Sequence, residues 1–103
     1  MSIAYELNFP DYLTDYEIET EAKGYLANLE IISQGKRYLL NVYDPVRLSQ
    51  DIETEITSDG YFSSANILIV PAVTRDEIRQ AIQKIAVGTF ANHWTSQAAD
   101  QTA

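Results

Sequence analysis

Cysteine is absent from this chain, which rules out disulfide bonds and thiolate metal sites and is typical of a reducing compartment. The N-terminus has no basic region followed by an apolar run, which a secretory signal would require. The longest apolar run, 67–70, is far too short to cross a bilayer. We therefore expect a cytoplasmic protein without a membrane anchor.

Basic residues are scarce, with seven lysines and arginines against fifteen acids and a formal net charge of −8. Nucleic acids and anionic membranes bind cationic surfaces, so we expect neither as a direct partner. A basic protein suits this chain better, because opposite charges accelerate the encounter of two proteins. Seven of the acids lie in residues 1–30, where Lys23 is the only basic residue.

Catalytic and cofactor motifs are also lacking: there is no phosphate-binding glycine loop, no Gly-x-Ser-x-Gly and no His-Glu-x-x-His. His93, the only histidine, has no evident neighbour to orient it as a general base, and we read His93-Trp94 as a segment that docks its indole ring. Glu17, Glu19 and Glu21 would lie about 7 Å apart along a strand, too far for one cation to collect them. The sequence predicts no enzyme activity, no metal and no cofactor.

The length of 103 residues and the hydrophobic fraction of 46% suit one domain with a single core. We expect this domain to span 1–94. The stretch 95–103 is small, polar and without periodicity, which predicts a disordered C-terminal tail.

The first half of the chain has the alternation of half-buried strands, at 3–9 and again at 16–22. Lys23-Gly24 and Gln34-Gly35 are interpreted as two-residue hairpin turns, which would join 16–22, 25–33 and 36–43 into a meander. Turn length then fixes the register. One face of the meander becomes almost entirely apolar and forms the predicted core face: Tyr16, Ile18, Thr20, Ala22, Tyr25, Ala27, Leu29, Ile31, Tyr38, Leu40 and Val42.

The second half predicts helix, strand and helix. Asp44-Pro45 is typical of a helix start and Asp59-Gly60 of its end, and the stripe between them comprises Leu48, Ile52 and Ile56. The run 65–70 predicts a strand.

The last predicted helix begins at a capping box, 74–77, and ends near Gly88, with Ile78, Ala81, Ile82 and Ile85 on its buried side. The fold class is therefore α+β. We expect an antiparallel sheet of about five strands, in the order β-β-β-β-α-β-α, with two helices packed on one face.

The same register predicts the opposite, open face of the sheet. It places Glu17 opposite Glu30 and Leu26 opposite Tyr43, so that an acidic margin lies beside apolar side chains. An ordinary solvated sheet face is the alternative interpretation. The candidate partner-binding residues are Glu17, Glu19, Glu21, Glu30, Leu26, Leu39 and Tyr43, together with Tyr61 after the first long helix.

Two functions fit these features. The first is a small acidic protein-binding module without catalytic activity, such as an inhibitor or immunity-type protein that neutralises a basic enzyme, for instance a nuclease. The second is a structural or assembly protein that associates with itself, as a homodimer or larger, through the open face or the edge strand 3–9.

Overall fold

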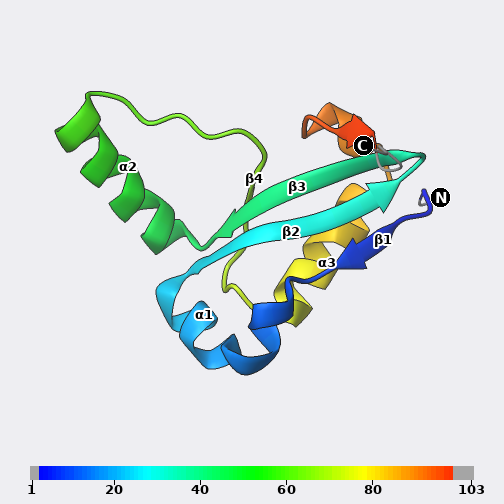
Figure 1. Ribbon diagram of the computed structural model, residues 1–103, viewed down its shortest axis with the longest axis horizontal. Coiled ribbons are helices and arrows are strands. Elements are labelled where there is room, and N and C mark those ends of the chain that lie inside the picture. The colour runs from blue at the N-terminus through cyan, green and yellow to red at the C-terminus, as the bar shows by residue number, and fades with distance from the viewer. Residues whose placement is uncertain (1–2, 99–103) are drawn as a thin grey trace.

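A computed structural model describes residues 3–98 and confirms the α+β class (Figure 1). Helices and strands are interspersed along the described part of the chain. The elements are β1 (Glu6–Asn8), η1 (Asp11–Asp15), α1 (Glu17–Lys23), β2 (Tyr25–Ser33), β3 (Lys36–Tyr43), α2 (Pro45–Asp59), β4 (Ile67–Ile69), α3 (Arg75–Ile85), η2 (Phe90–Asn92) and β5 (Gln97–Ala98), where η denotes a 3-10 helix.

The sheet is mixed, which corrects the prediction that it is antiparallel throughout. Within residues 3–98 the strand order is β1-β2-β3-β4, and β5 pairs with the start of β3. β1, β2 and β3 are antiparallel neighbours, whereas β4 runs parallel to β3. The parallel pairing follows from the chain path, because α2 carries the chain across before β4 begins, and a parallel pair needs such a crossover.

The β2–β3 hairpin agrees with the sequence at its turn. Gln34 and Gly35 have φ angles of 54° and 74°, the left-handed pair that a tight hairpin turn requires. From this turn the predicted register holds as far as Leu29 opposite Leu40, with Ile31 opposite Tyr38 on the way.

Beyond Leu29 the register shifts by one residue, which the sequence did not reveal. Leu26 pairs with Val42, so that Ala27 and Asn28 on β2 oppose a single residue of β3. Asn28 takes a left-handed φ of 64°, a conformation that asparagine tolerates better than most residues. Such a bulge turns Leu26 from the open face into the core, where it is fully buried.

The predicted strand over 16–22 is wrong, because this segment is helical. Alternation alone favoured a strand, yet three of its seven residues are glutamates and Ala22 and Lys23 follow at its end, all of them good helix formers. In α1 only Thr20 is buried, while Ile18 is 82% exposed and Tyr16, just before the helix, is 53% exposed. Gly24 has the predicted positive φ, 71°, but it ends a helix rather than forming a hairpin turn.

The caps of both long helices are as predicted. The Asp44 side chain accepts a hydrogen bond from the Arg47 backbone at 2.7 Å, and Gly60 ends α2 in the left-handed region. The Thr74 hydroxyl accepts from the Glu77 backbone at 3.2 Å at the start of α3. These caps satisfy backbone groups that a helix leaves free at its ends.

Only one of the two predicted helices covers the sheet. Figure 1 shows α3 along one side of the β2–β3 ribbon and α2 pointing away from the rest of the chain. Ile78 and Ile82 of α3 are fully buried, whereas α2, all of which the structure describes, buries none of its residues. The core therefore lies between α3 and one sheet face, and its fully buried members include Leu26, Leu29, Ile31, Val42 and Phe90.

The C-terminal segment closes one end of this core, as expected for His93-Trp94. Trp94 is buried, its ring stacks on Phe90 with centroids 6.1 Å apart, and its indole nitrogen donates to the Ile67 carbonyl at 3.1 Å. Thr95 follows with a backbone bond to the Asn66 side chain at 2.8 Å. The predicted tail, 95–103, lies in part outside the described residues.

Candidate binding surface

The face of the sheet opposite α3 carries the polar side chains of the two central strands. Glu30 opposite Leu39 and Ile32 opposite Arg37 stand there in the predicted register. None of these four residues is buried, in contrast to the fully buried residues that alternate with them. This surface, defined by Glu30, Ile32, Arg37 and Leu39, is called the open face below.

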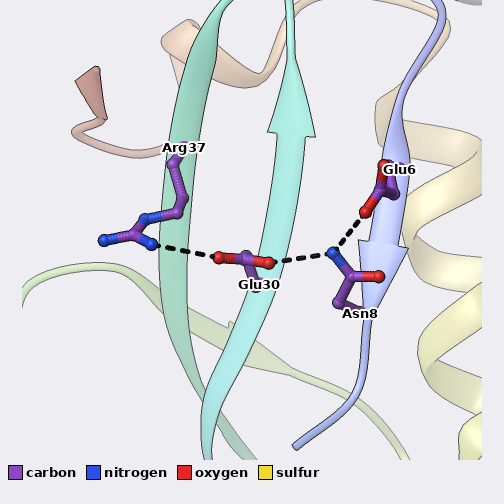
Figure 2. A network of polar contacts seen from close by, with 4 residues as sticks. All are labelled: Glu6, Asn8, Glu30 and Arg37. Atoms are coloured by element: carbon purple, nitrogen blue, oxygen red, sulfur yellow. Dashed lines mark hydrogen bonds and ion pairs between the residues drawn. The ribbon is translucent and has the colours of Figure 1, made fainter. Parts of the chain in front are cut away.

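A chain of polar contacts crosses the open face from β1 to β3 (Figure 2). The Asn8 amide donates to Glu6 at 2.7 Å and to Glu30 at 2.8 Å. The other oxygen of Glu30 accepts from Arg37 at 3.4 Å. Asn8 thus holds two carboxylates that would otherwise repel, and Glu30 has partners on both neighbouring strands.

Leu39 is the apolar centre of the open face. It is 39% exposed and lies between two shallow hollows, one bounded by Asn8 and Asn28, the other by Asn66 and Thr95. Ile69 on β4 adds a second exposed apolar side chain, 50% accessible. Because the two lie on adjacent strands, the open face combines apolar area with the acidic and amide groups of the network.

Tyr43, predicted as an open-face contact, is instead buried. Its ring lies 4.9 Å from that of Tyr25, and the Arg47 guanidinium stands 5.4 Å from the centroid of the Tyr25 ring. Burial raises the pKa of both tyrosine hydroxyls above the ordinary value of 10.0, because desolvation penalises the charged phenolate. This cluster joins β2 and β3 to the first turn of α2 and is structural.

Glu17, Glu19 and Glu21 are exposed as predicted, but on helix α1 and not on a sheet face. Glu17 accepts from Arg75 of α3 at 2.9 Å, and Arg75 in turn stands 4.9 Å from the centroid of the Phe9 ring. The predicted apposition of Glu17 and Glu30 is therefore wrong. Glu17 instead ties α1 to the beginning of α3.

The predicted contact residues consequently fall into separate groups. Leu39 and Glu30 lie together on the open face, and Tyr61 is 66% exposed in the loop after α2. Leu26 and Tyr43 are buried. Sequence reasoning missed α2 as a surface, although its apolar stripe was visible; the missing information was that α2 stands outside the core.

His93 is exposed, with its ring 5.7 Å from that of Trp94. In residues 3–98 no three acids or histidines come together as metal ligands, and no helix has the length and apolar character needed to cross a membrane. What the surface offers is apolar area next to carboxylates, which suits noncovalent recognition.

Comparison with protein-family models, with curated proteins and with solved structures finds no match to this chain. The case for its function rests on its own residues.

Proposed function

We propose that this protein is a small acidic binding module without catalytic activity that acts in the cytoplasm on a basic protein, as an inhibitor or immunity-type protein does on a basic enzyme such as a nuclease. The observation that carries the proposal is how the charges are distributed. Every arginine of the chain is ion-paired internally, so the chain's cations are largely used within the fold. The four pairs are Arg37–Glu30, Arg47–Asp51, Arg75–Glu17 and Arg79–Asp76.

Most of the remaining carboxylates are exposed and concentrated in two places. Among the described residues, eight exposed acids have no ion pair to a basic side chain. One is Glu6, which accepts a hydrogen bond from Asn8. The other seven are Asp11, Asp15, Glu19 and Glu21 on η1 and α1, here called the first acidic segment, and Glu53, Glu55 and Asp59 on α2, called the second.

This distribution suits a basic partner for two reasons. Exposed carboxylates create a long-range negative potential, which raises the association rate with a cationic protein. The same potential imitates the phosphate backbone that a nuclease binds, so the module can occupy the site of the nucleic acid. Apolar side chains at the centre of such a surface, such as Leu39, add affinity that salt does not screen.

Self-association is the second candidate function, and one observation favours it. The open face leaves Leu39 and Ile69 exposed on adjacent strands, and β1 ends the described sheet on its other side. A second copy seated on this face would bury both side chains. The edge strand is a weaker route, because β1 has only three residues to offer for pairing.

The test is capture from the native host's lysate at low and at high salt, with the retained proteins identified by mass. One basic protein retained at low salt and weakened at high salt would support the binding module. The variant with Glu17, Glu19 and Glu21 changed to Gln should remain folded and retain less of this protein. Recovery of the bait alone, eluting as a dimer or larger, would replace the proposal with self-association.

A matched variant changes the second acidic segment instead, with Glu53 and Glu55 changed to Gln and Asp59 to Asn. It removes the same number of charges from another part of the surface. Equal weakening by both variants indicates general charge attraction, and unequal weakening identifies the segment that contacts the partner. If neither variant alters capture at low salt, charge does not drive the recognition and the proposal fails.

A further inference from the structure

Helix α2 has an apolar side that the described chain covers only in part. Its stripe of Leu48, Ile52 and Ile56 repeats every four residues, as in a helix that packs against a neighbour. Leu48 and Ile52 are half-buried, Ile56 is 51% exposed, and no residue of α2 belongs to the core formed by residues 3–98. Figure 1 shows the helix extending from the end of β3 away from α3 and the sheet.

This exposure is unusual in energetic terms. A helix of 15 residues is only marginally stable in water unless one side packs against another element. α2 is held by the Asp44 cap, by Pro45 in the first turn, by Gly60 at the end, by the Arg47–Asp51 pair at 2.9 Å and by the contact of Arg47 with the Tyr25 ring. All but Gly60 act near the start of the helix, and Ile56 remains 51% exposed, so the outer part of the stripe calls for an occupant outside the described chain.

The charges beside the stripe specify that occupant. At about 100° per residue, Glu55 projects about 60° from the centre of the stripe and Asp59 about 20° from it, at the C-terminal end of the helix, whereas Glu53 projects about 100° away. α2 carries four acids against Arg47, which is itself paired with Asp51. A second copy of α2 would place four further acids against these, which is unfavourable. A basic segment with one apolar side satisfies both the stripe and its margins.

We propose that α2 is the docking helix of this module and receives a basic amphipathic helix of the partner protein. Apolar side chains of that helix pack on Leu48, Ile52 and Ile56, and its lysines or arginines pair with Glu55 and Asp59. Docking an apolar helix face against another is a recurring mode of peptide recognition. This inference rests on the proposed function and assigns its main contact to the second acidic segment.

The test uses a defined probe: a labelled 15-residue peptide of leucine and lysine, with leucines spaced to form one side of a helix. A scrambled peptide of the same composition has the same charge without the apolar side. Fluorescence anisotropy should show binding of the first peptide to the full chain and at least about tenfold weaker binding of the second.

Two variants of the chain locate the contact. Ile52→Ser with Ile56→Ser should weaken binding about tenfold, because the stripe loses both apolar side chains. Val46→Ser is the matched control: Val46 lies on α2, is 67% exposed and points about 120° from the centre of the stripe, so its change should leave binding unaltered. Circular dichroism confirms that both variants remain folded.

Three results would overturn the inference. The scrambled peptide could bind as tightly as the amphipathic one, or Val46→Ser could weaken binding as much as Ile52→Ser with Ile56→Ser does. The third is that the chain forms an oligomer, which Ile52→Ser with Ile56→Ser converts to a monomer. The last would make a second copy the occupant. If the basic protein captured from lysate is lost with the Glu17, Glu19 and Glu21 variant but retained by the α2 variants, the proposed function stands and the docking helix is refuted. If no basic protein is captured, the proposed function fails instead.

Discussion

The hydroxyl of Tyr12 meets both backbone polar groups of Ala27, donating to the carbonyl and accepting from the amide at 3.2 Å each. Ala27 is one of the two residues at the bulge in β2, where the ladder to β3 is interrupted. A bulge leaves a backbone amide and carbonyl without strand partners. Tyr12, from η1, supplies the missing donor and acceptor, and so links the N-terminal segment to the sheet.

Removing this hydroxyl should therefore destabilise the fold. Tyr12→Phe is expected to lower the free energy of unfolding by about 1 kcal/mol, the usual net worth of a hydrogen bond. Urea unfolding followed by circular dichroism measures the change. Tyr16→Phe is the control, because Tyr16 is 53% exposed and its hydroxyl makes no hydrogen bond within residues 3–98. Equal effects of the two changes would contradict a role for Tyr12 in the bulge.

The bulge also shows where prediction from sequence reached its limit. The hairpin register was predictable near the Gln34-Gly35 turn, since turn length fixes pairing there. Farther along, the register depends on the left-handed Asn28 and on Tyr12, which is distant in sequence. Alternation counted from the turn therefore placed Leu26 on the wrong face, and Tyr43 was expected to be exposed although Tyr25 covers it.

The prediction for the segment at α1 failed for a related reason. Residues 16–22 alternate like a strand, but they are also good helix formers, and the choice between the two is made by what they pack on. By contrast, both long helices were predictable because each has a local start signal, at Asp44 and at Thr74. Local capping did not reveal that α2 stands apart from the core, since that depends on tertiary packing.

Gly24 is expected to be far less replaceable than Gly60. Both have left-handed φ angles, 71° and 84°, so alanine is strained at either position. At Gly24 an added Cβ would also lie 2.6 Å from the Cγ of Asp44, whereas at Gly60 nothing lies within 4 Å. Gly24→Ala must displace the Asp44 cap of α2, so its cost should exceed that of Gly60→Ala by about 1–2 kcal/mol. Thermal unfolding of both variants tests this, and equal costs would contradict it.

Alkaline pH should weaken the fold through Tyr25 and Tyr43. Burial raises the pKa of both hydroxyls in the folded state, so above pH 10.0 the unfolded chain loses these protons first. Stability from this source is complete below pH 10.0 and falls as pH rises through the folded values. Urea unfolding over about pH 8 to 11 should show the decline. Tyr43→Phe should make this decline in stability smaller, and the double variant with Tyr25→Phe should make it smaller still. If the decline is the same in both variants as in the unaltered chain, these tyrosines do not cause it.

The stability of the fold should depend on the charge at position 8, although Asn8 is only half-buried. Its amide donates to Glu6 at 2.7 Å and to Glu30 at 2.8 Å, and so separates two carboxylates. Asn8→Ala removes the donor, at a cost of about 1 kcal/mol. Asn8→Asp replaces it with a third negative charge and should cost more at low salt, with part of the loss recovered at high salt because screening weakens repulsion. The stability of both variants, measured at two salt concentrations, decides the point. If salt does not reduce the cost of Asn8→Asp, the lost stability does not come from charge repulsion, and the shape of the side chain determines which residue fits here.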